Sequence, residues 1–494
     1  MGNVRGDIAK FTSSRKDDAR LADAVLAINK AHVVMLMEQK IIQWQDGAKI
    51  LSALQKQDSQ KLDPNAEDVH MAVEEAVLAE MGPEVGGNLH IAKSRNDQVT
   101  TAIRMALRKE LLNIIQQVID MQENLLSTAS KHTETIILAY THLQPAQPVT
   151  FAHYLLSHAG GLGRDLQRLQ SVYERINQCP LGAGALATTS FPINRKTTAE
   201  LLGFSTVLEN SIDAVGSRDF ILETQSALTL LAVNLSRLAE DLIIWSSPEF
   251  GTVELPDEFT STSSIMPQKK NPEVLEVIRA RASYALGDFV ASAAALKSLP
   301  STYNLDFQEI TPKLWASTDN LAASLDIFMK LIPNLKVSSN VEGKAAAGFV
   351  GATELANMLV RKYNFAFRTS HKIVGTLVKA LIDSKQTLLD ATPELLNKVA
   401  QETAGINLTV KKADIVECTN PRRLIETYKV QGGPSPAEVE RAITSTNKTL
   451  TKAKTSIAKL NEYLANAENT LNSTVKSYSQ VESSKNGRLK NSKV

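Results

Sequence analysis

The chain has 494 residues, of which 43% are hydrophobic and 22% charged, an ordinary composition for a globular protein long enough to form two or three domains. Its 54 basic and 53 acidic residues give a formal charge of +1, so the overall charge provides no reason to expect binding to nucleic acid or to an anionic membrane. Cys179 and Cys418 are far apart, and no apolar run is long enough to span a bilayer, so we expect a cytoplasmic protein with reduced thiols.

The predicted elements are almost all helices. Near residues 97–130, apolar residues recur at steps of three or four, which is the period of one face of an α-helix. Similar long patterns cover roughly 151–178, 220–246 and 272–298. Several helices near 25 residues, with no alternating strand pattern between them, predict an all-α fold with an elongated central bundle. Their apolar coverage is too broad for lone surface helices, so we expect contacts with other subunits.

Turn-forming residues divide the chain into predicted domains. The sequence breaks at Gly82-Pro83, at Gly343 and at Gly432-Gly433-Pro434. We expect two smaller helical domains on either side of the bundle, followed by an extension. The predicted boundaries are 1–94, 95–343, 344–445 and 446–494.

The extension differs in composition from the rest of the chain. From Ser445 onward it is basic and rich in Ser, Thr and Asn, which favours a solvated tail, with a nucleic-acid-binding arm as the alternative. The last fifteen or so residues are predicted to be disordered. A helical arm over 447–478 is also possible, because apolar residues are spaced seven apart at Leu450, Ile457, Leu464, Leu471 and Tyr478.

Residues 263–272 read Ser-Ser-Ile-Met-Pro-Gln-Lys-Lys-Asn-Pro and place hydroxyl, ammonium and amide groups before a strong helix start. Asn271 is the predicted N-cap and Pro272 the first helical residue. Because a helix N-terminus carries about half a positive charge, this loop is suited to meet an anion, and Ser263 near Lys269 would lose its proton more readily than a free alcohol. The simpler interpretation is a polar loop that caps a helix.

Residues 139–148 read Ala-Tyr-Thr-His-Leu-Gln-Pro-Ala-Gln-Pro and are predicted to form a rigid loop between two long helices. His142 lies in this loop, and imidazole is the side chain best able to exchange protons near neutral pH. Thr141 beside it offers a hydroxyl to a carboxylate. Taken alone, such a histidine is more often a structural one.

Residues 88–98 read Asn-Leu-His-Ile-Ala-Lys-Ser-Arg-Asn-Asp-Gln and lead into the first long helix. Lys93 and Arg95 supply positive charge for a dicarboxylate, and Asn96 can both donate and accept hydrogen bonds. The alternative role is capping, with Asn96 or Asp97 as the N-cap, and the two roles are compatible.

In order and spacing, these three segments closely resemble the signatures of the fumarase/aspartase superfamily, whose enzymes break a C–N or C–O bond by β-elimination and release fumarate. The SRNDQ run at 94–98 and the QKKNP run at 268–272 resemble the argininosuccinate lyase branch. The resemblance covers nearly all of residues 1–440. It implies the superfamily lyase fold, a homotetramer whose active sites each draw on three subunits, a small-molecule substrate, and no cofactor or metal.

The resemblance also implies roles for individual residues. Ser263 would take the Cβ proton, His142 would protonate the departing guanidino nitrogen, and Lys269 would stabilise the doubly charged intermediate. Which of Ser263 and His142 is the acid and which the base stays open. Substrate binding is implied for Ser14, His90, Arg95, Asn96, Thr141, Asn271, Tyr303 and Gln308.

Two departures from the family pattern concern the substrate-binding residues. Relatives often have Gly-Arg where this chain has Ala92-Lys93, so charge is kept but the guanidinium fork is not. Many relatives continue Gln-Glu-Asp-Lys from the position of Gln308, and that lysine touches the substrate. Here Thr311 occupies its place, so the contact is either lost or taken over by Lys313.

Residues 182–187 fit a loose G-x-G-x-x-A dinucleotide pattern. No strand or βαβ unit surrounds them, and Cys179-Pro180 stands just upstream, so we reject a cofactor site here. The run resembles the glycine-rich mobile loop of the family, with Thr188 where glycine is usual. No cluster with metal-ligand spacing occurs in the sequence.

The resemblance implies a carbon–nitrogen lyase that splits argininosuccinate into arginine and fumarate, the last step of arginine biosynthesis. One alternative is another fumarate-releasing lyase, such as adenylosuccinate lyase, and the SRNDQ and QKKNP runs count against it. The other is a non-catalytic structural protein, since the fold has also been used as a lens crystallin. The presence of His142, Ser263 and Lys269 together counts against that alternative.

Overall fold

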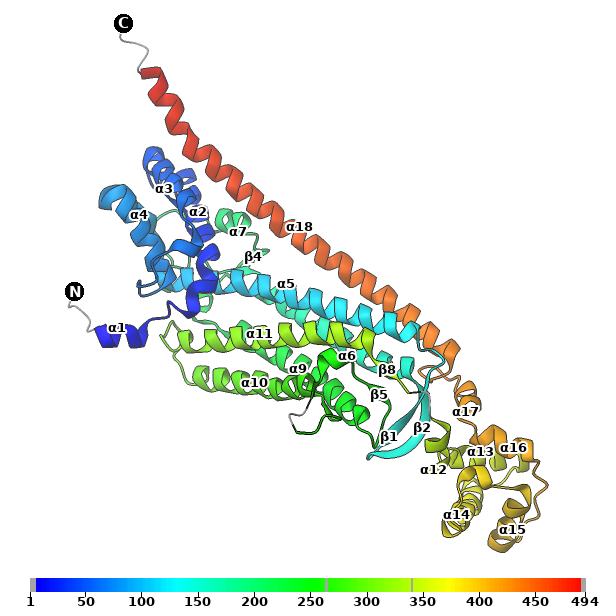
Figure 1. Cartoon of the computed structure of the whole chain (residues 1–494). Coiled ribbons are helices and arrows are strands. Elements are labelled where there is room, and N and C mark those ends of the chain that lie inside the picture. Colours follow the sequence, from blue (N-terminus) through cyan, green and yellow to red (C-terminus); the bar gives the residue numbers. More distant parts are fainter. Residues whose placement is uncertain (1–5, 263–264, 339–340, 490–494) are drawn as a thin grey trace.

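The computed structural model describes residues 6–262, 265–338 and 341–489, and long helices make up most of it (Figure 1). Neighbouring helices of the central bundle pack along one another, α5 on α6, α6 on α9, α9 on α10 and α10 on α11. The elongated all-α bundle predicted from the sequence is confirmed. Its helices are α5 (Arg95–Ser130), α6 (Phe151–Ile176), α9 (Asp219–Ser246), α10 (Glu273–Leu296) and α11 (Phe307–Leu331).

The bundle helices form where the apolar period predicts them, and their ends agree with the predicted ends to about two residues. The predicted apolar stripes face the core, because a period of 3.6 residues places these side chains on one side of each helix. The buried stripe residues are Ile103, Leu107, Leu111, Ile114, Val118 and Leu125 in α5 and Leu228, Leu231, Leu235, Leu238 and Leu242 in α9.

The amino-terminal helices pack against the start of the bundle, and their apolar side chains join those of the bundle and of the last helix in one continuous core. The last of them is interrupted at Gly82 (φ 72°), next to Pro83, where the sequence predicts a break. These helices are α1 (Gly6–Thr12), α2 (Ala22–Glu38), α3 (Trp44–Lys56) and α4 (Val69–Gly86). Two short helices, α7 (Arg195–Leu201) and α8 (Ser211–Gly216), lie between α6 and α9 in the chain.

A second core lies in the carboxyl-terminal small domain, which extends from one end of the bundle (Figure 1). Its buried side chains run from Leu355 to Cys418 and do not join the main core. The helices of this part are α12 (Glu342–Ala347), α13 (Ala352–Tyr363), α14 (Phe367–Asp383), α15 (Pro393–Ala404), α16 (Lys412–Thr419) and α17 (Pro421–Thr427).

The last helix, α18 (Pro436–Leu489), runs back along α5 and reaches α3 (Figure 1). The predicted boundary at 446 therefore falls inside this helix. Leu450, Ile457 and Leu471 are buried, with 3%, 1% and 3% of their surface exposed. The interpretation of this segment as a solvated tail is therefore wrong, and the seven-residue apolar spacing marks the helix face that packs on the same chain.

The strands are short. They are β1 (Ile136–Thr141), β2 (Gln144–Thr150), β3 (Gln178–Cys179), β4 (Thr206–Val207), β5 (Val253–Glu254), β6 (Ser261–Thr262), β7 (Lys270–Asn271) and β8 (Lys336–Val337). They pair two by two, antiparallel as β1–β2, β5–β8 and β6–β7 and parallel as β3–β4. Short 3₁₀ turns occur at Asp17–Leu21, Ser59–Lys61, Gly87–His90, Asp257–Phe259, Ile332–Asn334 and Leu388–Asp390.

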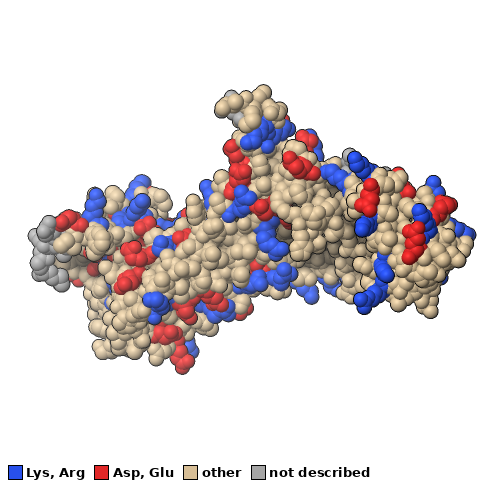
Figure 2. All heavy atoms as spheres, turned by 90° about the horizontal axis from the view of Figure 1, so that it is seen from below, with Lys and Arg blue, Asp and Glu red and all other residues tan. Residues whose placement is uncertain are grey.

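Two surface properties of the described chain bear on its partners. Within the described ranges, no helix combines the length and the apolar character needed to cross a membrane. Seen from below, on the side of α10, basic and acidic side chains are both spread over the surface (Figure 2). This mixed distribution agrees with the nearly zero net charge of the sequence.

Candidate functional site

The first signature segment forms the amino-terminal start of α5. Ser94 is the N-cap: its hydroxyl accepts from the Asn96 backbone N–H at 3.3 Å, and its own backbone N–H donates to Asp97 Oδ1 at 3.0 Å. This capping box places Arg95 and Asn96 in the first helical turn. The predicted capping role therefore belongs to Ser94 together with Asp97, which leaves the side chain of Asn96 outside the cap.

Charged side chains of opposite sign gather beside this helix start. Arg95 forms an ion pair with Asp68, the N-cap residue of α4, and its Nη2 lies 3.9 Å from Glu74 Oε2. His90 Nδ1 lies 3.5 Å from the same Glu74 oxygen. The hydrogen bond from His90 and the nearby charges hold the pKa of Glu74 below its usual range. His90 and Arg95 therefore share one carboxylate.

Ser14 lies close to a second carboxylate, because its hydroxyl donates to Asp18. Burial raises the pKa of Asp18 to about 6, against the hydrogen bond from Ser14, which lowers it. Asp68 adds to the rise through its charge, so Asp18 lies near the cluster around Arg95. The predicted substrate-contacting serine thus sits at the edge of the same group of charges.

Tyr303 and Gln308 lie at the amino-terminal end of α11 and are hydrogen-bonded to each other through their side chains. Burial raises the pKa of Tyr303, while the guanidinium of Arg218 opposes that rise. Asp18 and Asp68 also act on Tyr303 through their charges. The structure therefore brings Tyr303 and Gln308 to the same end of the bundle as Ser14, His90, Arg95 and Asn96.

Position 311, for which the family resemblance implies a lysine, is occupied by a buried threonine. Thr311 is 4% exposed, and its hydroxyl donates to the carbonyl oxygen of Phe307 within the helix at 3.4 Å. Lys313 lies two residues further along α11, where the helical rotation of about 100° per residue directs it away from the face of Gln308. Thr311 therefore supplies no positive charge at this position, and Lys313 lies on another face of α11.

The second signature forms the β1–β2 hairpin. The prediction of a rigid loop between two helices is therefore wrong. The strands pair from Ile136–Thr150 to Thr141–Gln144, and His142 and Leu143 form the two-residue turn. Both turn residues have positive φ, 56° and 58°, which is the conformation that matches the twist of a tight hairpin. Proline residues in the second strand hide this pairing from the sequence pattern. Thr141 and His142 are exposed at the tip of the hairpin.

The third signature connects β6 to β7, and Ser263 lies outside the described residues. Lys269 is exposed, and its backbone N–H donates to Met266 O at 3.1 Å. The prediction that Asn271 caps the following helix is wrong. Asn271 pairs with Ser261 in the short β6–β7 ladder, which moves the N-cap position of α10 to Pro272.

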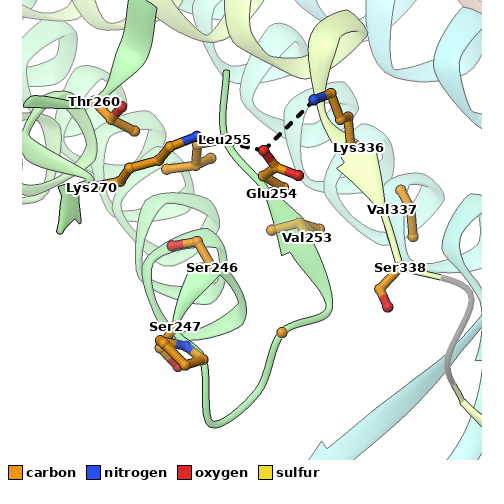
Figure 3. A pocket seen from close by; sticks show the side chains of 12 residues that line it. Ser246, Ser247, Val253, Glu254, Leu255, Thr260, Lys270, Lys336, Val337 and Ser338 are labelled. Atoms are coloured by element: carbon orange, nitrogen blue, oxygen red, sulfur yellow. Dashed lines mark ion pairs between the residues drawn. The ribbon is translucent and has the colours of Figure 1, made fainter. Parts of the chain in front are cut away.

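A pocket of about 440 Å³ lies beside the base of this segment (Figure 3). Glu254 stands between Lys270 and Lys336, with its Oε1 3.6 Å from each Nζ. Lys270 also pairs with Asp257 at 2.5 Å, and that hydrogen bond raises the pKa of Lys270 above its usual range. Lys270 therefore anchors β7 to β5 and to the turn at Asp257–Phe259. The volume of the pocket is large enough for a small molecule.

The predicted site residues form two groups in one chain. One group lies at the end of the bundle near α1 and α4, and the β1–β2 hairpin lies at the opposite end (Figure 1). Lys270 of β7 lines the pocket together with Ser246 and Ser247 at the end of α9 and with Lys336, which follows α11 in the chain, so β7 lies far from the start of α11. A single chain therefore brings together the substrate-binding residues Ser14, His90, Arg95, Asn96, Tyr303 and Gln308, but not Thr141, His142, Lys269 and Asn271 with them.

Sequence reasoning missed the acidic side of the first group. Asp68, Glu74 and Asp18 each contact a predicted site residue, yet none was predicted. One signal was available for Asp68, because it stands immediately before an apolar helical pattern, where aspartate is a preferred N-cap. Within the described ranges, no three His, Cys, Asp or Glu side chains are grouped so that they could hold a metal ion.

Residues 8–287, which include most of this all-α bundle, match the family model described as lyase, so the chain belongs to the lyases. The structure of EDDS lyase in complex with formate is 32% identical and superposes with a TM-score of 0.89 over 94% of this chain and 93% of that one. A fumarate lyase:delta crystallin from Brucella melitensis, 19% identical over 82% of this chain and 90% of that one, shares the fold with a TM-score of 0.68.

The particular family follows from the carboxyl-terminal part and from the whole sequence. Residues 349–426 match the family model described as argininosuccinate lyase C-terminal. The argininosuccinate lyase of Methanococcus vannielii is 43% identical over 95% of this chain and 98% of its own length. That of Methanocaldococcus jannaschii is 44% identical over 90% and 92%. The chain belongs to the argininosuccinate lyase family.

Proposed function

We propose that this chain is an argininosuccinate lyase, which splits argininosuccinate into L-arginine and fumarate in the cytoplasm, as the last step of arginine biosynthesis. The observation that carries the proposal is the 43% identity with argininosuccinate lyases over nearly the full length of both chains. The second candidate activity is that of EDDS lyase, which is favoured by a TM-score of 0.89 but has only 32% identity.

The chemistry of the reaction explains which side chains it needs. A base removes a proton from Cβ, the electron pair forms the Cα=Cβ bond after an aci-carboxylate intermediate, and the Cα–N bond breaks as the guanidino nitrogen takes up a proton. Ser263 is the proposed base and His142 the proposed acid, with the reverse assignment left open. Lys269 and the amide of Asn271 stabilise the extra negative charge that develops on the carboxylate.

The substrate-binding proposal combines the two groups of residues. Arg95, His90 and Asn96 supply donors for the substrate carboxylates, and Thr141 adds a hydroxyl. Ser14 also binds the substrate carboxylates, and Tyr303 and Gln308 border the same end of the bundle and contact the substrate. Asp68 pairs with Arg95 and Glu74 lies beside His90, so these two carboxylates hold the side chains of Arg95 and His90 at this end of the bundle.

We further propose that the active enzyme is a homotetramer whose sites are shared between subunits. The separation of the two groups along one chain supports this, because the β1–β2 hairpin with Thr141 and His142 lies at the opposite end of the bundle from Asn96 and the residues near α4 (Figure 1). Helices α9 and α10 also expose large apolar side chains on the bundle surface, which a soluble monomer seldom leaves uncovered. These are Leu230, Val233, Val277, Tyr284, Leu286 and Val290.

The direct test offers the purified protein argininosuccinate, adenylosuccinate and EDDS in parallel and follows the absorbance of fumarate. We expect fumarate from argininosuccinate with a kcat/KM at least a hundredfold above that for the other two substrates. Arginine should appear in equal amount. Preferred turnover of EDDS or of adenylosuccinate would contradict the proposal, and no fumarate from any of them would favour a structural role of the fold.

A further inference from the structure

The buried carboxylate of Asp97 joins two segments that are distant in the sequence. Its side chain has no exposed surface. Asp97 Oδ1 accepts from Ser94 N at 3.0 Å, whereas Oδ2 accepts from Gly182 N at 3.0 Å and from Gly184 N at 2.9 Å. One oxygen therefore completes the cap of α5, and the other holds a loop 85 residues further along the chain.

This loop, residues 181–189, is here called the glycine loop. Gly182 and Gly184 both have positive φ, 86° and 63°, a conformation that glycine adopts without strain. A Cβ atom on Gly184 would lie 2.6 Å from the carbonyl oxygen of Thr188, which closes the turn by donating its N–H to Ala183 O at 2.8 Å. The base of the loop is buried, while Ala185 and Thr188 are exposed at its tip.

Asn96, the neighbour of Asp97, contacts the same loop. Its Nδ2 donates to the carbonyl oxygen of Ala185 at 3.0 Å. This contact fixes the plane of the Asn96 amide, which still has an oxygen and a second N–H to offer to a ligand. Two consecutive residues of the first signature thus hold the glycine loop, one through a buried charge and one through a half-exposed amide.

The Asp97 carboxylate is a strong acceptor because it is charged and shielded from water. Burial raises its pKa to about 6, against the three backbone N–H groups and Lys93, which favour the ionised form. The group is therefore ionised at neutral pH, and hydrogen bonds to an ionised acceptor are about twice as strong as neutral ones. Replacing this oxygen by a hydrogen-bond donor would release the loop rather than only weaken its contact with residue 97.

We propose that Asp97 is a positioning residue for substrate binding: its carboxylate holds the glycine loop, and the loop orients the amide of Asn96 toward the substrate carboxylate. This inference deepens the proposed argininosuccinate lyase function and depends on it for the role of Asn96. The link between Asp97 and the loop amides stands on the geometry alone.

The test variant is Asp97→Asn, which keeps the size of the side chain but replaces one oxygen by an NH₂ group. If the remaining oxygen still accepts from Ser94, the NH₂ faces the amides of Gly182 and Gly184, donor against donor. We expect KM for argininosuccinate to rise about tenfold to a hundredfold, the effect of losing a hydrogen bond to a charged group, with kcat changed less than threefold. Hydrogen exchange of a peptide covering 181–189 should accelerate by at least tenfold.

Two further variants separate the loop contact from the helix cap. Ser94→Ala removes the capping hydroxyl of the same helix but leaves the Asp97–loop contact, so KM and loop exchange should stay within about threefold of wild type. Gly184→Ala disturbs the contact from the loop side and should reproduce the effects of Asp97→Asn. Combined with Asp97→Asn it should add little, because both changes break the same contact.

Each outcome bears on one part of the inference. If Asp97→Asn keeps the KM and the loop exchange rate of the wild type, the inference is overturned. It is also overturned if Ser94→Ala changes both quantities as much as Asp97→Asn does, because Asp97 would then act only in the helix cap. Gly184→Ala carries the test if circular dichroism shows that Asp97→Asn does not fold. If the wild type does not split argininosuccinate, the proposed function fails, whereas the exchange measurements still confirm or contradict the Asp97–loop contact.

Discussion

At the scale of single residues, Lys93 shows what burial does to a charge next to the proposed site. It is 8% exposed, and its ammonium donates to the amide oxygen of Asn29. Burial lowers the pKa of Lys93 to about 7, although Asp97 and Glu74 favour the charged form. An arginine at this position, as the family resemblance implies for many relatives, could not give up its charge at any physiological pH. The lysine therefore provides a positive charge that is lost when the pH rises above its pKa of about 7.

We predict that Lys93 makes the stability of the protein increase with pH above neutrality. Between the folded pKa of about 7 and the ordinary value of 10.5, the unfolded chain holds more protons at this position than the folded one, so the free energy of unfolding rises with pH. The rise is at most about 1.4 kcal/mol per pH unit. Lys93→Met should remove this contribution, as measured by urea unfolding at pH 7 and pH 9 at one protein concentration.

Lys93→Arg is the matched control for this effect. The guanidinium stays charged, so its desolvation cost should persist at pH 9. The difference between the free energies of unfolding of the wild type and this variant should therefore increase as pH rises. Other groups around Lys93 also titrate or carry charge, and they are unchanged in all three proteins: Asp97, Glu74, Arg95, His32 and His70. An equal pH slope in wild type and Lys93→Met would contradict the prediction.

Ser263 permits the sharpest test of the proposed chemistry. If it exchanges the Cβ proton, Ser263→Ala should lower kcat by a factor of about 10²–10⁴, the usual contribution of general acid–base catalysis. KM should change little, because the lost interaction acts in the transition state. Thr141→Ala should instead raise KM, since its hydroxyl is proposed to bind a carboxylate.

Thr262→Ala is the control, because Thr262 is an exposed hydroxyl of β6 next to the signature segment. It should retain wild-type kcat and KM. If Ser263→Ala keeps more than about a tenth of kcat, Ser263 is not the base, and His142 becomes the candidate. His142→Asn should lower kcat and remove one limb of the pH–rate profile.

At the scale of elements, α18 has the greatest consequence for stability. Its far end packs on the amino-terminal helices: the rings of Tyr478 and Trp44 lie 4.7 Å apart, and the Tyr478 hydroxyl donates to Glu38 at 2.9 Å. Near its middle, the Tyr463 hydroxyl donates to Phe204 O at 3.3 Å. Helix α18 therefore ties α2 and α3, whose neighbour α4 carries Asp68 and Glu74, to the bundle.

We predict that shortening α18 at Leu460 destabilises the protein, whereas a solvated tail could be removed without effect. The point substitution Leu471→Ala should cost about 2–5 kcal/mol, because Leu471 is 3% exposed and a cavity would remain. Lys459→Ala, on an exposed position of the same helix, should cost less than about 0.5 kcal/mol. Urea unfolding midpoints give both values, and equal midpoints would contradict the packing of α18.

At the scale of the whole molecule, the distribution of the site residues leads to the predicted homotetramer. Light scattering should give about four times the mass of one chain in a fully active preparation. A monomer with full activity would contradict this, because one chain leaves Thr141 and His142 at the far end of the bundle from Asn96 (Figure 1). The apolar side chains exposed on α9 and α10 provide the surface that assembly would cover.

Mixed assemblies test whether the sites are shared. Subunits with Ser263→Ala and subunits with Asn96→Ala, inactive or weak alone, should regain activity when unfolded and refolded together, because some sites then receive both intact residues. Mixing Ser263→Ala with Lys269→Ala is the control, since both changes affect the same segment and no site is repaired. Equal activity of the two mixtures would show that each site comes from one chain.

The sequence by itself determined the elements whose signals are local. Helix positions follow from an apolar period that repeats within a few residues, and the first signature contains its own capping box. The order of the three signatures was sufficient for the family. Local signals failed where pairing between two strands changes the backbone, as at Asn271, which pairs with Ser261 in a strand rather than capping a helix.

Only the tertiary structure decided which distant residues meet. The contacts of Arg95 with Asp68, of Asp97 with the glycine loop and of Tyr478 with Trp44 join parts of the chain that no local pattern connects. The reason is physical: a helix buries its apolar stripe against any suitable partner, and the packing of the whole bundle selects one arrangement among them. That arrangement also places the β1–β2 hairpin with Thr141 and His142 at the opposite end of the bundle from Asn96, which no pattern within one segment could show.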